Sequence, residues 1–208
     1  MKSESRTERN TVPKKLNASL RKNAKPKKWK TDPSLLLCPN IPKPMHGVAP
    51  REIMGQVWWD AERKKAYAKN AYHCEACGVH KFDAKGRQWL EAHEVYDIDY
   101  KRGRMTFVRI VPLCHFCHNY IHDGRLNALI DQGKLSQRKF TAIIQHGDAV
   151  LAKNGISKTT YNNREYSMGQ LMLEGGVAPW KDWRLVFNGK EYPSKFKTEE
   201  DWEKYYGV

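Results

Sequence analysis

The sequence predicts an α+β fold, and three observations support that prediction. Two β-prone runs, residues 88–96 and 105–111, are separated by a polar connection of the kind that closes a hairpin. One Cys-x-x-Cys pair precedes this hairpin and a second pair follows it. Apolar residues at helical spacing lie on both sides of the bracketed region. We therefore expect a hairpin core with flanking helices.

Length and composition bound the class of protein. The chain has 208 residues, and its hydrophobic content of 40% can fill only a modest core. No apolar run approaches the roughly 18 residues that cross a bilayer, and the basic N-terminus lacks the apolar part of a secretory signal. We therefore expect a cytoplasmic protein with no membrane contact. The formal net charge of +14 makes nucleic acid the first partner to consider.

Residues 1–35 are expected to form a basic, disordered arm. Residues 1–30 contain eleven Lys and Arg and two Glu, which is +9 of the +14 charge. With few large apolar side chains, the arm cannot offset its ordering entropy. It could lie along phosphates, with Trp29 stacking on a base, or serve as a solubilising tail or targeting signal. The phosphate-binding candidates are Lys25, Lys27, Lys28 and Lys30.

Residues 36–71 are expected to hold a linker and a helix. The segment 38–44 contains three prolines and is typical of an extended linker. Pro50 suits the first turn of a helix that should run to about residue 68. Its apolar stripe comprises residues 53, 54, 57, 58 and 61. We expect Trp58 and Trp59 to pack in the protein and not to stack on bases.

The core is expected to span residues 72–132. Within the connection 97–104, Gly103 suits a positive φ. A short helix should follow Cys114 and end near Gly124, which suits the position after a helix C-terminus.

Two further units are expected after the core. In a helical segment, residues 133–175, Ser136 suits the N-cap of a helix to about residue 153, which Gly147 weakens and could bend. In the C-terminal unit, residues 176–208, Asn188-Gly189 between two β-prone runs predicts a type I′ hairpin.

A final helix should complete the C-terminal unit. Thr198, with Asp201 three residues later, resembles a capping box that opens it. This unit would be a small hairpin-helix appendage, and none of its residues suggests catalysis.

The two Cys-x-x-Cys pairs predict a structural zinc site. Each pair places two thiolates within reach of one ion, and four sulfurs satisfy tetrahedral Zn²⁺ without leaving a position for substrate. Buried or redox-active thiols are the alternative. The expected ligands are Cys74, Cys77, Cys114 and Cys117, whereas Cys38 is left over in the linker.

Histidines gather around the second cysteine pair and predict a second metal site. His118 and His122 are four residues apart and would project from one face of a helix. His93 lies on the first strand, which a hairpin followed by a helix would place beside that helix. His115, between two zinc ligands, is the weakest candidate. The others, His46, His73, His80 and His146, show no partner pattern.

These residues resemble a known family. Residues 90–95 (Leu-Glu-Ala-His-Glu-Val), the polar connection and residues 113–122 (Leu-Cys-His-Phe-Cys-His-Asn-Tyr-Ile-His) look like the zinc-stapled core of HNH endonucleases, in the His-Me finger or ββα-metal superfamily. The resemblance covers about residues 74–122, under a third of the chain. It implies a treble-clef-like ββα-metal core, and it implies that His118 and His122 bind the catalytic cation.

The resemblance departs from the family pattern at the end of the first strand, where the family has a metal ligand followed by the general base. Aligning on Leu90 makes His93 the ligand and Glu94 the base. Aligning on the histidine instead makes His93 the base and places Ala92, which cannot bind a metal, at the ligand position. We favour the first register. However, successive strand residues point to opposite faces unless the strand ends or bulges.

A second departure is Arg109, which stands where the family has the Asn that fixes the loop of the base. This arginine could contact a phosphate instead, together with Arg102 and Arg104. Asp97 and Asp99 are weaker alternatives for the base.

Together these observations predict a metal-dependent DNA endonuclease acting on double-stranded DNA. One divalent ion, Mg²⁺, Mn²⁺, Ni²⁺ or Zn²⁺, would bind the scissile phosphate while the base activates water. The resemblance implies 5′-phosphate and 3′-hydroxyl products and a bacterial or phage protein. The alternative is a decayed HNH-type zinc module that binds nucleic acid or a protein partner without cleaving. An RNase on the same scaffold is a third hypothesis.

Overall fold

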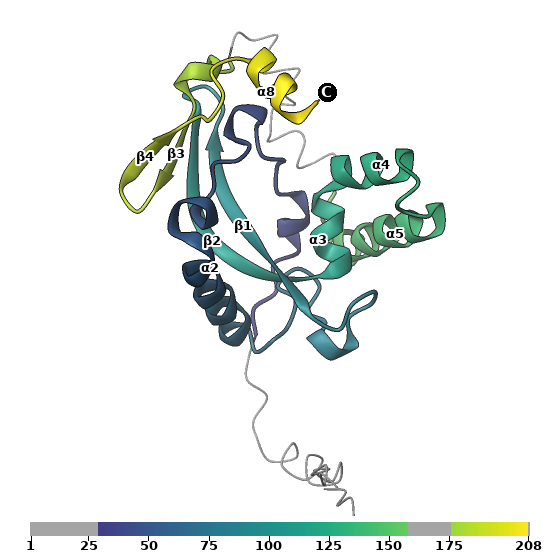
Figure 1. The fold of residues 1–208 in the computed structure, drawn as a ribbon. Coiled ribbons are helices and arrows are strands. Elements are labelled where there is room, and N and C mark those ends of the chain that lie inside the picture. Colours follow the sequence, from purple (N-terminus) through teal and green to yellow (C-terminus); the bar gives the residue numbers. More distant parts are fainter. Residues whose placement is uncertain (1–28, 158–175, 208) are drawn as a thin grey trace, which may run out of the picture.

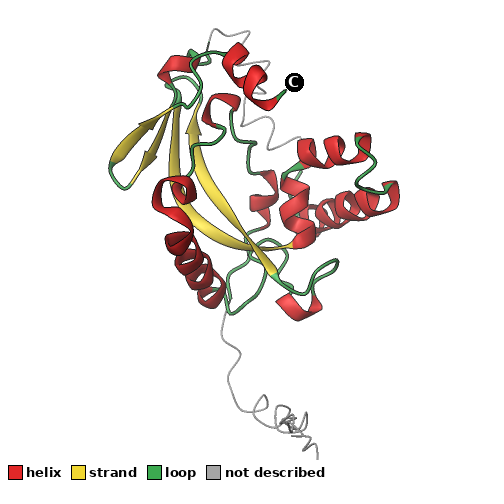
Figure 2. Ribbon diagram, in the orientation of Figure 1, coloured by secondary structure: helices red, strands yellow, loops and turns green. Residues whose placement is uncertain are grey.

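The computed structural model describes residues 29–157 and 176–207 of the chain. Its strands form one mixed sheet in the order β1 (Leu90–Asp99), β2 (Arg104–Cys114), β3 (Arg184–Phe187) and β4 (Lys190–Pro193) (Figure 2). The β2–β3 pair is parallel and the other two pairs are antiparallel. The α-helices of the described ranges are α2 (Pro50–Lys69), α3 (His115–Ile121), α4 (Asp123–Asp131), α5 (Gln137–Lys153) and α8 (Glu199–Tyr206). The predicted α+β class is therefore confirmed.

The long β1–β2 hairpin organises the molecule, with α2 on one side of it and α3, α4 and α5 on the other (Figure 1). The predicted strands are present but longer than expected, because residues 97–99 of the polar connection pair with residues 104–106. Gly103 has the predicted positive φ, at 63°. A bulge lies between Val95 and Tyr96, which shifts the register just after the histidine on β1.

Helix α2 begins at Pro50 as predicted, but only part of its apolar stripe packs against the core, through Ile53 and Trp58. Gly55 has a φ of 80° and a ψ of 174°, which kinks the chain and rotates the two parts relative to one another. As a result, Val57 is 87% exposed and Met54 is also exposed. Trp58 packs as expected, with its ring centroid 5.6 Å from that of Phe187.

The predicted end of the arm at residue 35 is wrong. The 3₁₀ helix η1 (Pro33–Leu37) buries Leu35 and Leu36 in the core that surrounds the cysteines. These leucines supply the apolar anchor that the preceding residues lack. Trp29 stacks on His73 with 3.8 Å between ring centroids, so its ring is engaged within the protein. Lys25, Lys27 and Lys28 lie outside the described residues.

The short helix predicted after Cys114 is present, but Gly124 is not the residue that follows its C-terminus. Helix α3 stops at His122, whose φ of −94° and ψ of 51° break the helix, and α4 restarts at Asp123. Gly124 thus lies inside α4. Continuation is favoured because Leu126 reaches the core and is 1% exposed.

Helix α5 begins as predicted, with Ser136 Oγ accepting from the backbone N–H of Lys139. Gly147 does not interrupt it. Instead, a Cβ at this position would lie 2.1 Å from Tyr120 Cδ2, so the glycine allows α5 to approach α3 closely. The rest of the predicted helical segment, residues 158–175, lies outside the described ranges.

The C-terminal unit contains the predicted hairpin and helix, but the hairpin is part of the central sheet. Asn188 and Gly189 have φ values of 50° and 70°, as a type I′ turn requires. Thr198 Oγ1 accepts from the backbone N–H of Asp201 at 3.2 Å and caps α8. Because β3 pairs with β2, apolar side chains of these two strands contribute to a second core. Its buried members are Met45, Met105, Ala178, Trp183, Leu185 and Phe187.

Candidate metal centres

The four predicted cysteine ligands meet in one cluster. The sulfurs of Cys74, Cys77, Cys114 and Cys117 all lie within 4.8 Å of one another, and none is in a disulfide. The first pair lies in the turn before η3 (Lys81–Asp83), whereas Cys114 ends β2 and Cys117 lies in α3. Four sulfurs at this separation could hold a structural metal such as zinc.

Charge crowding makes a cation favourable at this cluster. Hydrogen bonds from Cys114 and Cys117 lower the pKa of the Cys77 thiol, whereas the same kind of contact with Cys114 raises the pKa of Cys117. The buried sulfurs therefore compete for negative charge, and they cannot all ionise without a compensating ion.

Backbone contacts hold the first cysteine turn against the sheet. The N–H of Cys74 donates to the carbonyl of Val79, and the N–H of Glu75 donates to the carbonyl of Pro112 on β2. Arg109 reaches from β2 to Glu75, with 2.8 Å between Nη1 and Oε1. Arg109 thus ties the turn to β2, which is a structural role that the sequence did not indicate.

His146 is a neighbour of this cluster that the sequence pattern missed. Its Nε2 lies 3.3 Å from the sulfur of Cys117. The residue comes from α5, 29 positions along the chain, so no local spacing could have identified it.

The three predicted histidines also meet. One ring nitrogen from each of His93, His118 and His122 lies within 4.8 Å of those of the other two. His93 is brought there by β1, His118 by α3 and His122 by the break between α3 and α4. The ring centroids are 4.8–5.6 Å apart. This convergence is the arrangement that the sequence predicted.

Burial keeps two of these imidazoles uncharged. It lowers the pKa of His93 to about 3, aided by repulsion from His122 and His118. It also lowers the pKa of His122 to about 4, with further contributions from His118 and Arg125. Neutral imidazoles offer lone pairs, which is the state that a metal ion requires.

Glu91 orients the cluster and was not predicted. Its carboxylate accepts from Nδ1 of His118 at 2.6 Å and from Nδ1 of His115 at 2.7 Å. Burial raises the pKa of Glu91, but these hydrogen bonds outweigh it and lower the pKa to about 2. With Nδ1 of His118 engaged, Nε2 is left for a cation, as in carboxylate–histidine–metal arrangements. The signal was present, because Glu91 and His93 share one face of a strand.

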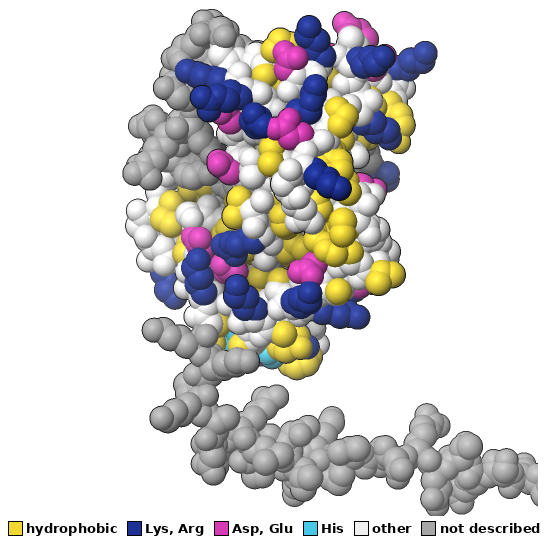
Figure 3. Space-filling view, turned by 90° about the vertical axis from the view of Figure 1, so that its left-hand side faces the viewer, with side chains coloured by type: hydrophobic (Ala, Val, Ile, Leu, Met, Phe, Trp, Pro, Cys, Tyr) yellow, Lys and Arg dark blue, Asp and Glu magenta, His cyan; other side chains and the backbone are white. Residues whose placement is uncertain are grey.

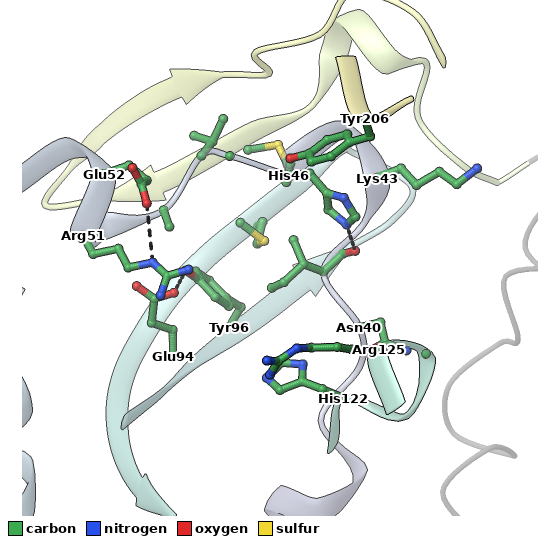
Figure 4. Close-up of a pocket in the computed structure, with 17 residues that line it drawn as sticks. Asn40, Lys43, His46, Arg51, Glu52, Glu94, Tyr96, His122, Arg125 and Tyr206 are labelled. Carbon is green, nitrogen blue, oxygen red and sulfur yellow. Dashed lines mark hydrogen bonds and ion pairs between the residues drawn. The ribbon is translucent and has the colours of Figure 1, made fainter. Parts of the chain in front are cut away.

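Glu94 is not part of the histidine cluster. Its Oε2 accepts from the hydroxyl of Tyr96 at 3.0 Å, and burial raises its pKa. Its Oε1 is buried without a hydrogen-bond partner in the described structure. However, Glu94 and His122 line the same cavity, which has a volume of about 490 Å³ (Figure 4).

The donor set fits some ions better than others. Three imidazole nitrogens suit Zn²⁺, Ni²⁺ and other transition metals, whereas Mg²⁺ prefers oxygen ligands. Three protein ligands would also leave a position open, as catalytic zinc sites do.

The described candidates for phosphate contact are mostly engaged elsewhere. Arg102 pairs with Asp99 at 3.2 Å, and Arg104 pairs with Glu191. The backbone N–H of Lys30 donates to Asn70 Oδ1, and its side chain is exposed. On the face that carries α2 and β4, Lys and Arg are interspersed with acidic and apolar side chains (Figure 3).

Comparison with protein-family models, with curated proteins and with solved structures gives no match for this chain. No helix of the described ranges has the length and apolar character needed to cross a membrane.

Proposed function

We propose that this protein is a metal-dependent DNA endonuclease of the HNH type, which hydrolyses phosphodiester bonds beside a structural four-cysteine zinc site. The observation that supports this proposal best is the convergence of His93, His118 and His122 on one point. A cluster of three buried or half-buried imidazoles from a strand, a helix and a helix break has no packing purpose that apolar residues would not serve better.

In this proposal the three histidines hold the catalytic divalent ion. When bound, the ion would neutralise charge on the scissile phosphate and on the leaving oxygen. Glu91 fixes the ring of His118 through Nδ1, so that Nε2 is presented without reorganisation.

Glu94 is the proposed acceptor of the proton from the attacking water. It lines the cavity that also contains His122, and burial raises its pKa although Arg51 and the hydroxyl of Tyr96 interact with its carboxylate. His93 is the weaker choice because its ring belongs to the histidine cluster. The geometry therefore favours the register in which His93 is a ligand.

The test is nicking of supercoiled plasmid with added Mn²⁺, Ni²⁺ or Zn²⁺, for wild type and for His93→Ala, His118→Ala and Glu94→Gln. We expect each variant to lose at least about a hundredfold in rate, in line with the usual contribution of general acid–base groups. His80→Ala, outside both metal clusters, is the matched control and should nick as wild type does. Equal nicking by all five proteins would refute the site assignment.

The same assay separates the rival functions. Preferential cleavage of an RNA of the same sequence would indicate an RNase. Salt-dependent DNA binding without cleavage under any of these ions would indicate a binding module on a decayed HNH-type core.

A further inference from the structure

The cavity beside the histidine cluster is larger than a scissile phosphate needs. Its volume of about 490 Å³ falls in the range of roughly 300–1,000 Å³ that small-molecule sites occupy. Its walls come from residues 40–49, the start of α2, β1, β2, the start of α4 and α8, and His122 is one of its lining residues. The cavity is therefore continuous with the proposed catalytic site.

One cation on the cavity wall lacks an acidic partner. Arg125 lies three residues after His122, near the start of α4, and points into the cavity (Figure 4). By contrast, Lys43 pairs with Glu199 at 2.6 Å and Arg51 with Glu52 at 3.6 Å. Within the described ranges no ion pair involves Arg125. An exposed guanidinium beside a cation site favours an anion such as a phosphate in the space between them.

Aromatic rings line another part of the cavity. Tyr206, on α8, is 45% exposed, and its ring meets that of His46 edge-on with 6.1 Å between centroids. His46 is held in place because its Nδ1 accepts from the indole N–H of Trp202 and its Nε2 lies 3.0 Å from the carbonyl oxygen of Ile41. Fixed aromatic rings of this kind are the platforms on which unpaired bases stack.

We infer that this cavity receives one unpaired nucleotide of the strand that is cut, with Arg125 binding a phosphate and Tyr206 stacking on the base. The inference rests on the proposed function and names its substrate class. A base within a continuous duplex cannot enter the cavity between the residue 40–49 segment and α8, because it must first leave its stack. The enzyme therefore prefers DNA with a flap, a gap or a single-stranded end.

The experiment is fluorescence anisotropy without added divalent ions, using the full chain with its zinc. The probes are a labelled blunt duplex and the same duplex with a short single-stranded flap. We expect wild type to bind the flap DNA about tenfold more tightly, as stacking of one base permits. Arg125→Ala and Tyr206→Ala should each remove most of this difference and leave blunt-duplex binding within about twofold.

Exposed residues elsewhere provide matched controls. Arg138→Ala on α5 and Tyr72→Ala, before η3, change exposed residues of the same types outside the cavity, and both should keep the wild-type preference. Competition by a free deoxynucleoside monophosphate, lost in Arg125→Ala, would support the inference.

Equal affinity of wild type for the two DNAs, or equal losses in the control variants, would overturn the inference. If the protein cleaves plasmid but binds the flap and blunt duplexes equally, this inference is refuted and the proposed function stands. A preference for the flap DNA that depends on Arg125, without cleavage of any DNA, would support the nucleotide site and refute the proposed nuclease function.

Discussion

Glu91→Gln is the substitution that best separates an organised metal site from a chance gathering of histidines. Glu91 accepts hydrogen bonds from His118 and His115, and its side chain is 17% exposed. Glutamine keeps one acceptor oxygen but replaces the second oxygen with an NH₂ group, which can only donate. One charge-assisted hydrogen bond is lost outright and the other becomes neutral, which should cost about 1.5–3 kcal/mol of unfolding free energy.

Glu91→Gln should also weaken metal binding, by more than the substitution of an exposed glutamate does. Because His118 loses the partner that fixes its ring, we expect the second cation to bind about 10–100-fold more weakly. Isothermal titration calorimetry with Zn²⁺ or Ni²⁺, on protein first loaded with one equivalent of Zn²⁺, measures this affinity. Glu203→Gln on the exposed face of α8 is the control and should bind as wild type does. Unchanged affinity and stability in Glu91→Gln would show that Glu91 does not organise a metal site.

Three further predictions concern the scaffold. Cys117→Ser should release the structural metal and unfold the core, since zinc binding contributes about 10–16 kcal/mol in small zinc domains. Metal analysis and circular dichroism test this. Cys38→Ser is the control and should keep both the metal and the folded core. Gly147→Ala should cost about 1–3 kcal/mol by urea unfolding because its Cβ overlaps Tyr120, whereas Gly124→Ala, with open space around it in α4, should stabilise by up to about 1 kcal/mol. Burial lowers the pKa of His46 below 6.5, so the unfolded chain binds more protons and stability should fall as pH drops below about 6.5. Because the pKa values of His93 and His122 are also lowered, His46→Phe should reduce this fall without abolishing it, and urea unfolding at pH 7.5 and 5.5 measures the difference. An equal fall in wild type and His46→Phe would contradict the prediction.

Much of the histidine and cysteine geometry could be predicted from the sequence because it depends on short spacings. The two cysteine pairs and the i, i+4 histidines are local patterns. A hairpin between the cysteine pairs then places His93 beside the helix that carries His118. The Asn188-Gly189 turn and the Ser136 and Thr198 caps succeeded for the same reason, since each depends on a few adjacent residues.

The failures depend on contacts between residues far apart in the chain. The register of β3 beside β2, the anchoring of Leu35 and Leu36 and the contact of His146 with Cys117 leave no periodic trace in the sequence. Gly55 was overlooked because an apolar stripe suggested a straight helix, although a glycine within it permits a kink. Glu91 was missed although strand alternation placed it on the face of His93.

Native mass spectrometry of the chain in the presence of Zn²⁺, beside His118→Ala, tests the central claim most directly. Three imidazoles and four thiolates on separate clusters predict two zinc ions for wild type and one for the variant. One ion in both proteins, or two in both, would contradict the assignment of His93, His118 and His122 to a metal site.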